Sequence, residues 1–186
     1  WVQTDDVLVE NIRTGVMDRL SLGYNDLLKE NPRLIYCAIS GFGQSGELRD
    51  LPAYDQIIQG MSGIMSITGD AKSSPLRVGY PIADTVGGIT AAFAISSNLA
   101  NKHRTEGVFI DVSMLEAAMS TMGWVVSNYL VADRIPQAMG NENMTASPSG
   151  TFKTSDGLIN IAANKQEHFE KVCVILDHPE WISDPQ

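Results

Sequence analysis

The order of strand, helix and strand near the N-terminus constrains the fold of this chain more than any other feature. Asp6 to Asn11 (DVLVEN) is a short β-branched apolar run that ends in a turn former, which predicts a buried strand. Residues 15–32 follow with helical spacing that is interrupted near Gly23 and ends before Pro32. Arg33 to Ser40 (RLIYCAIS) predicts a second strand. This order over roughly thirty residues predicts a βαβ unit, a parallel sheet and a right-handed crossover.

Further elements are expected downstream of this unit. One helix covers 53–68 and frays at Ser62-Gly63, and another covers 82–99 with large apolar residues at helical spacing. Small residues in the second helix let another backbone approach, so we expect it to be buried. Residues 108–113 predict a short strand or an extended link, and 114–131 predict one long helix. The fold class expected is α/β, with a partial Rossmann-like parallel sheet and helices.

The composition of the chain changes after residue 135. Residues 136–150 have no periodicity and are rich in Asn, Ser, Gly and Pro, which predicts a linker. Two alternating runs around Asp156-Gly157 then predict a β-hairpin, and an amphipathic helix follows. We expect three parts: a large domain at 1–135, the linker, and at 151–186 the beginning of a smaller α+β domain.

Charge and hydrophobic content bear on the possible partners. The formal net charge of −9 argues against a nucleic-acid-binding protein, which needs a basic patch. The weakly polar run 79–99 contains too many polar side chains for a membrane span. Cys37 and Cys173 lie far apart among apolar residues, as buried reduced thiols do. We therefore expect a cytoplasmic protein with no nucleic-acid and no membrane partner.

Asp84 is the first candidate for chemistry. It is the only charged residue between Arg77 and Ile95 and stands at the start of the helix expected at 82–99. One interpretation is that it caps the helix, since an Asp there accepts backbone N–H bonds and suits the positive end of the helix dipole. The other is that it acts as a base, or as a nucleophile toward an activated acyl group, because small neighbours leave room for a ligand.

The turn after the first strand is the second candidate. Its polar end precedes a glycine and a helix, the arrangement by which open α/β sheets present ligand sites. Arg13 and Arg19 are either binding groups for a phosphate or ordinary surface arginines. His103, His168 and His178 have no Cys, His or Glu at metal-ligand spacing, so we expect no metal site.

Several stretches together resemble one protein family. The chain is similar to the class III, formyl-CoA transferase-like CoA-transferases in four ordered blocks: DVLVENIRTGVMDRLSLGYNDLLKENPRLIYCAISGFGQSG, AYDQIIQGMSGIMSITGD, RVGYPIADTVGGITAAFAI and HRTEGVFIDVSMLEAAM. A further stretch, PSGTFKTSDGLINIAANKQEHFEKVC, resembles the start of the small domain of that family. Because family members are about twice as long, the resemblance implies an internal fragment or a truncated member, with a homodimer as the expected assembly.

The resemblance also implies roles for seven residues. Asp84 falls on the aspartate of the family that carries CoA as an aspartyl thioester, formed through a mixed anhydride. Six residues fall on positions that contact coenzyme A or lie near the acyl group: Asn11, Ile12, Arg13, Arg19, Leu20 and Tyr54. The implied substrates are an acyl-CoA and a carboxylic acid, with CoA as a substrate and no metal.

Two alternatives remain beside CoA transfer. The first is a truncated, non-catalytic chain that binds CoA or associates with itself. The second is an isomerase similar to the α-methylacyl-CoA racemases, which carry a His as the second base where this chain has Tyr54. The Tyr argues against a mechanism with two bases.

Overall fold

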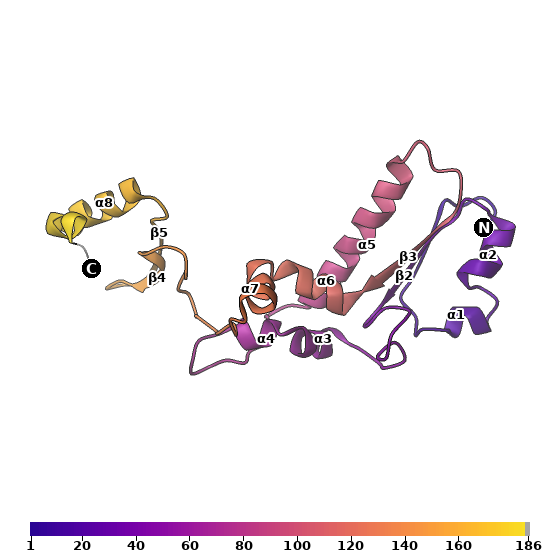
Figure 1. The fold of residues 1–186 in the computed structure, drawn as a ribbon, viewed down its shortest axis with the longest axis horizontal. Coiled ribbons are helices and arrows are strands. Elements are labelled where there is room, and N and C mark those ends of the chain that lie inside the picture. The colour runs from indigo at the N-terminus through magenta and orange to yellow at the C-terminus, as the bar shows by residue number, and fades with distance from the viewer. Residues whose placement is uncertain (185–186) are drawn as a thin grey trace. The chain divides into compact units, whose positions relative to one another are not determined.

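A three-stranded parallel sheet forms the centre of the N-terminal region (Figure 1). The computed structural model describes residues 1–184. Strands β1 (Val7–Glu10), β2 (Ile35–Ser40) and β3 (Val108–Ser113) lie in the order β1-β2-β3. The predicted parallel sheet is therefore confirmed, and the segment expected as a strand or a link is its third strand. The register places Cys37 of β2 between Val9 and Ile110.

The helices that connect β1 to β2 along the chain cover one face of the sheet. The interruption expected near Gly23 separates α1 (Val16–Arg19) from α2 (Tyr24–Glu30). Leu27 of α2 packs against the sheet in a buried apolar cluster with Leu34, Tyr36 and Ala38, and Tyr24 of the same helix packs against this cluster. This cluster holds the crossover against the β1–β2 pair, so the turn after β1 starts from a fixed position.

The crossover from β2 to β3 contains three helices. They are α3 (Asp55–Ser62), α4 (Ile64–Ile67) and α5 (Ile82–Ala100), and Gly63 between the first two has φ = 88°. Only glycine adopts this left-handed conformation at no steric cost, which explains the break expected there. The segment expected as one helix with a frayed point at Ser62-Gly63 is thus two helices that meet at Gly63.

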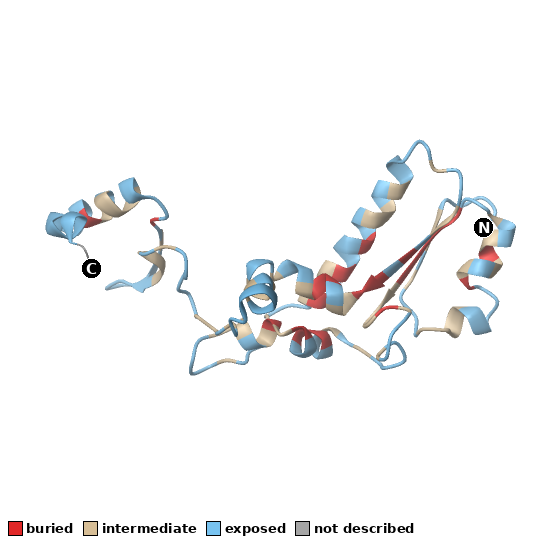
Figure 2. Ribbon diagram, in the orientation of Figure 1, coloured by how far each residue is buried: buried red, intermediate tan, exposed pale blue. Residues whose placement is uncertain are grey.

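Helix α5 lies on the sheet through its small residues. Its buried positions recur every four residues, at Ala83, Gly87 and Ala91, and Ala91 packs with Cys37 and Ile110. Figure 2 shows the buried residues on the sheet and on one side of α5. The expectation of a buried helix was wrong, because large apolar side chains of α5 are exposed to solvent. The side chain of Phe93, for example, is 75% exposed. Because the residues of α5 that face the sheet are small, the helix backbone lies close to the sheet.

The helix expected at 114–131 is also two helices. Gly123, with φ = 46° and ψ = −112°, separates α6 (Met114–Thr121) from α7 (Trp124–Ala132). The apolar pattern runs through the break without interruption, so it gave no sign of this turn. Helix α6 packs against α3 and α5 in a cluster that includes Ile58, Ile64, Ala83 and Ala118.

The chain divides into two compact units, 1–66 with 76–136 and 67–75 with 137–186. In the second unit, β4 (Ser149–Lys153) and β5 (Leu158–Ala162) form the expected antiparallel hairpin. Helix α8 (Gln166–Ile175) and a 3₁₀ helix (Pro179–Ser183) follow. The domain limits expected from the sequence stay a prediction, and their end at 185–186 lies outside the described residues.

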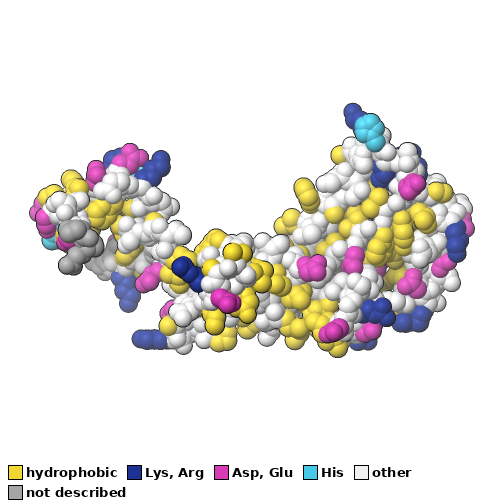
Figure 3. Space-filling model, viewed as in Figure 1, with side chains coloured by type: hydrophobic (Ala, Val, Ile, Leu, Met, Phe, Trp, Pro, Cys, Tyr) yellow, Lys and Arg dark blue, Asp and Glu magenta, His cyan; other side chains and the backbone are white. Residues whose placement is uncertain are grey.

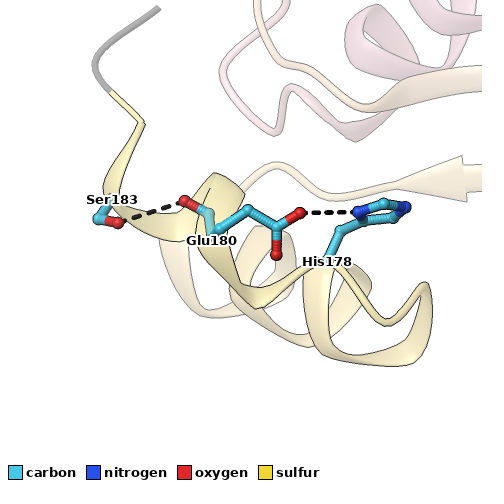
Figure 4. A network of polar contacts seen from close by, with 3 residues as sticks. All are labelled: His178, Glu180 and Ser183. Carbon is cyan, nitrogen blue, oxygen red and sulfur yellow. Dashed lines mark hydrogen bonds and ion pairs between the residues drawn. The ribbon is translucent and has the colours of Figure 1, made fainter.

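Local contacts shape the C-terminal end of the second unit (Figure 4). The Nδ1 atom of His178 lies 2.8 Å from Oε1 of Glu180, and the hydroxyl of Ser183 donates to the Glu180 carbonyl. The His178 ring stacks on Trp181 with centroids 4.2 Å apart. The hydrogen bond from His178 lowers the pKa of Glu180 below its ordinary value. These contacts hold one short turn together.

Apolar side chains also lie on the surface of the first unit (Figure 3). Helix α7 buries none of its residues, and Trp124, Leu130 and Val131 are exposed. Within residues 1–184, none of the helices combines the length and the hydropathy that a membrane crossing requires. Cys37 and Cys173 are buried and unpaired, as expected, and desolvation raises the pKa of the Cys37 thiol.

Candidate active site

A cavity of about 720 Å³ opens in the first unit at the carboxyl ends of all three parallel strands. Residues 11–14 follow β1, residues 39–41 lie at the end of β2, and Met114 follows β3. In open α/β sheets ligands bind at this edge, because the loops that leave the strands there surround a common space. The remaining wall comes from the loop at 49–54 and from α5.

The cavity gathers six of the seven side chains expected from the sequence. They are Asn11, Ile12, Arg13, Arg19, Tyr54 and Asp84. Leu20 is the exception: it follows α1, is exposed and does not line the cavity. The roles that the resemblance assigns to these residues stay predictions, but their proximity is a property of the fold.

Asp84 stands in the first turn of α5, whose N-cap residue, Pro81, makes no side-chain capping hydrogen bond. Asp55 at the start of α3 supplies that contact instead: its Oδ1 accepts a hydrogen bond from the backbone N–H of Ala83 at 2.8 Å. The N-terminus of α5 is therefore stabilised from a different helix. The Asp84 carboxylate is left exposed toward the cavity and free to meet a ligand.

A buried amide connects Asp55 to the segment that leads into α5. The Nε2 of Gln59 donates to Oδ2 of Asp55 at 2.7 Å and to the carbonyl of Tyr80 at 3.3 Å. Its Oε1 accepts the backbone N–H of Val78 at 2.8 Å. Gln59 is fully buried, so these bonds form where water cannot compete. The network fixes residues 78–83 against α3 and with them the position of Asp84.

The environment of Asp84 disfavours its charged form. Partial desolvation by neighbouring protein atoms raises the pKa of Asp84 above its ordinary value of 3.8, although the side chain remains exposed. The negative charge of Asp55 raises it further. A carboxylate of higher basicity is a better nucleophile once it is ionised, so these contacts suit chemistry more than capping.

The charge of the cavity differs in sign from the charge of the chain. Its lining contains three arginines, Arg13, Arg19 and Arg49, against two aspartates, Asp50 and Asp84, a formal balance of +1. Arg49 lies 3.5 Å from Asp50 in an exposed ion pair, which contributes little to stability. A positive cavity in a chain of net charge −9 favours an anionic ligand.

Contacts within the turn after β1 hold its shape. The backbone N–H of Ile12 donates to Oε2 of Glu10 at 2.7 Å. Desolvation raises the pKa of Glu10, while this hydrogen bond lowers it and the charge of Asp18 raises it. The turn that presents Asn11 and Arg13 to the cavity is therefore held by the last residue of the strand.

Arg49, Asp55, Gln59 and Gly88 are among the residues of the site that had not been indicated by the sequence. Arg49 stands in a loop without a motif, and Asp55 and Gln59 read as ordinary positions of an amphipathic helix. Only Gly88 carried a signal, because it lies one helical turn after Asp84 and so on the same side of α5.

A second cavity, of about 440 Å³, adjoins the first and shares Thr14, Arg19, Arg49 and Asp50 with it. The Thr14 hydroxyl and the Gln44 amide nitrogen, both in its lining, are buried without a partner within residues 1–184. Over the same residues, no three side chains of His, Cys, Asp or Glu are grouped so that they could hold a metal ion.

Comparison with known proteins assigns the chain to a family. The model of CoA-transferase family III matches residues 2–186. The chain belongs to CoA-transferase family III. The resemblance noted in the sequence is thereby confirmed, and the family is enzymatic. Its members transfer CoA, so anionic CoA thioesters are the substrates of the family.

Two curated CoA-transferases illustrate the relationship. The chain is 39% identical to an acetyl-CoA:oxalate CoA-transferase of Acetobacter aceti, over 100% of its own length and 48% of the relative. It is 38% identical to a succinyl-CoA:glutarate CoA-transferase of Mus musculus, over 96% of its own length and 41% of the relative. The family III chain thus spans about half the length of the curated relatives that it matches.

A solved structure gives the same result for the fold. A CaiB/BaiF family protein of Brucella suis superimposes with a TM-score of 0.84 at 35% identity. The match covers 99% of this chain and 49% of that protein. The family III assignment therefore extends to the parallel sheet, its helices and the smaller antiparallel sheet.

Proposed function

We propose that the chain takes part in CoA transfer from an acyl-CoA to a carboxylic acid, with Asp84 as the nucleophile. The observation that carries the proposal is the free Asp84 carboxylate in a net positive cavity at the carboxyl edge of the sheet. Membership of CoA-transferase family III supports the reaction class.

The first half of the reaction moves CoA onto the protein. A carboxylate oxygen of Asp84 attacks the thioester carbonyl carbon, the C–S bond breaks, and CoA leaves as the thiolate. The thiolate then attacks the Asp84 carbonyl carbon of the mixed anhydride and expels the donor as its free carboxylate. The product of this half is an aspartyl-CoA thioester on Asp84.

The second half repeats the exchange with the acceptor. The acceptor carboxylate attacks the aspartyl thioester and releases CoA thiolate, which then attacks the acceptor carbonyl carbon. Asp84 leaves as a carboxylate and the acceptor leaves as its CoA ester. Because one thioester replaces another, the reaction is close to balanced, and the protein contributes mainly by orienting the groups and stabilising charge.

Three arginines of the cavity are suited to the anionic parts of CoA. Arg13 and Arg19 stand at either end of the turn and helix that follow β1, and Arg49 faces them from the loop after β2. Guanidinium groups bind phosphate through paired N–H donors. We assign these three residues, with Asn11 and Ile12 beside them, to CoA binding, and Tyr54 to the acyl end.

Trapping of the covalent intermediate tests the proposal. The chain is incubated with an acyl-CoA and then with hydroxylamine, which converts an aspartyl anhydride or thioester to a hydroxamate. Peptide mass spectrometry is expected to place the hydroxamate on Asp84, with none in the Asp84→Asn variant. Unmodified wild-type protein at a saturating concentration of several acyl-CoA esters would contradict catalysis by this chain.

A chain that binds CoA without turnover, or only associates with itself, is the second candidate. It is favoured by the exposed apolar residues of α7. Binding of free CoA with no hydroxamate on Asp84 would identify this case. Assembly as a homodimer and a cytoplasmic location stay predictions.

An isomerase of the racemase type is disfavoured by Tyr54. This residue lies in the cavity with Asp84 and is 78% exposed, so a base at this position would reach the ligand. A phenol is a poorer second base than an imidazole at neutral pH. Exchange of the α-proton of a 2-methylacyl-CoA into deuterium oxide would reveal such an activity.

A further inference from the structure

Gly88 leaves an open space in the cavity one helical turn from Asp84. It is the seventh residue of α5, and residues four apart on a helix lie on the same side with their Cβ atoms about 5–6 Å apart. Both residues line the 720 Å³ cavity. A Cβ atom added at Gly88 would meet no other atom within 4 Å, so packing within the chain does not exclude a side chain there.

The neighbouring Gly87 has a different reason to be glycine. It is buried, and a Cβ atom there would lie 3.2 Å from Cγ of Met114 and 4.0 Å from Cγ2 of Ile39. Gly87 thus allows α5 to lie close to α6 and the sheet. Gly88 has no such contact, yet glycine in a helix interior is less stable than alanine. The chain therefore keeps a destabilising residue at a position whose empty space belongs to the cavity.

We propose that Gly88 is a specificity-determining residue, whose missing side chain makes room for the acyl group of the CoA ester that reacts at Asp84. The assignment rests on the proposed function. An acyl group bonded to, or approaching, the Asp84 carboxylate extends over the next turn of α5, where Gly88 presents only backbone. Position 88 then sets how large an acyl group fits in this part of the cavity.

Side chains of increasing size at position 88 should therefore weaken the binding of larger acyl groups and leave the binding of the CoA part unchanged. Alanine adds one methyl group into open space, and valine adds three carbon atoms in all. A mismatch of one methyl or methylene group in a fitted pocket changes binding by roughly tenfold or more. Acetyl-CoA, whose acyl group is short, should tolerate both substitutions better than butyryl-CoA.

Calorimetric titration of the chain with free CoA, acetyl-CoA and butyryl-CoA tests the assignment. The proteins compared are the wild type, Gly88→Ala, Gly88→Val and, as the matched control, Gly87→Ala. We expect the affinity of Gly88→Ala for free CoA and acetyl-CoA to stay within about twofold of wild type. Its affinity for butyryl-CoA is expected to fall roughly tenfold, and that of Gly88→Val to fall further. Gly87→Ala should change all three affinities by the same factor.

Thermal melting supplies a second, independent measurement. Gly88→Ala should melt at a higher temperature than wild type, because alanine favours the helix and meets no atom. Gly87→Ala should melt lower, since its methyl group presses on Met114. A lower melting temperature for Gly88→Ala would show that the space is filled in solution and would overturn the assignment. Light scattering would then show whether a second copy of the chain fills it.

The outcomes separate this assignment from the proposed function. If the wild-type chain binds none of the three ligands, the proposed function fails and the assignment fails with it. If the wild type binds all three and the ratio of acetyl-CoA to butyryl-CoA affinity is unchanged in both Gly88 variants, only the assignment fails. A wild type that binds acetyl-CoA but rejects butyryl-CoA also overturns it, since the space at Gly88 would then serve no larger acyl group.

Discussion

Asp55 of α3 caps helix α5 through its 2.8 Å hydrogen bond with the backbone N–H of Ala83, the residue immediately before Asp84. One carboxylate thus performs the structural task, and the adjacent one is left without a capping bond. Desolvation raises the pKa of Asp84, and the negative charge of Asp55 nearby raises it further. Under the proposed function, the structural and the reactive roles at this helix end are divided between two aspartates from different helices.

Replacing Asp55 by Asn should lower both the stability of the chain and the pKa of Asp84. Both Asp55 oxygens accept hydrogen bonds, from Ala83 and from Gln59, so an amide NH₂ group there would face a donor. A mismatched buried pair costs about 1–3 kcal/mol. Urea unfolding measures the loss, and the carbon-13 carboxyl shift of Asp84 as a function of pH measures its pKa. An unchanged Asp84 titration would show that the charge of Asp55 has no effect.

Gln59→Leu should destabilise the first unit by about 2–3 kcal/mol. Leucine has a similar volume but leaves the Val78 N–H, the Tyr80 carbonyl and one Asp55 oxygen without their partner. The measurement is chemical denaturation followed by circular dichroism. Gln56→Leu, at an exposed position of the same helix, is the matched control and should change stability little. Equal losses for the two variants would contradict the role of the network.

The stability of the wild type and of Asp84→Asn should differ most at neutral pH. Because the folded-state pKa of Asp84 is raised, the folded protein holds this proton at pH values where the unfolded chain has released it. The contribution of Asp84 to stability is therefore full below 3.8, the ordinary value, and is lost as the pH rises through the folded-state pKa. Asn cannot titrate, so the unfolding free energy of the variant should rise relative to that of the wild type as the pH increases across this range.

Unfolding free energies measured from about pH 4 to pH 8 check this sign. Glu47→Gln removes an exposed carboxylate and serves as the control for a general change of charge. A difference between wild type and Asp84→Asn that shrinks with rising pH would mean that the pKa of Asp84 is lowered in the folded state.

Gly123→Ala should destabilise the chain by about 1–3 kcal/mol. The glycine has φ = 46° and ψ = −112°, a conformation that a residue with a Cβ atom adopts only with strain. Nothing lies within 4 Å of an added Cβ, so backbone strain is the only expected cause. Gly79→Ala, which also meets no atom and has no positive φ, is the control. Similar melting temperatures for both variants would show that the break between α6 and α7 tolerates alanine.

Much of the fold could be predicted from local patterns. The parallel βαβ unit, the breaks near Gly23 and Gly63, and the antiparallel hairpin all follow from residues close together in the sequence. The single helix at 114–131 was wrong because one glycine turned the backbone inside a continuous apolar pattern. The burial of α5 was wrong because apolar periodicity does not say which side of a helix a neighbouring sheet can approach.

The candidate site divides in the same way. The sequence by itself determined the chemical groups, since Asp84, Arg13 and Arg19 stand in stretches that resemble a known family. Only the tertiary structure decided that Asp55 caps the helix of Asp84, across 28 residues, and that Gln59 reaches Val78 across 19. It also decided that Gly87 faces the core while Gly88 faces the cavity. Local patterns follow from forces between near neighbours, whereas these contacts depend on how separate helices pack on the sheet.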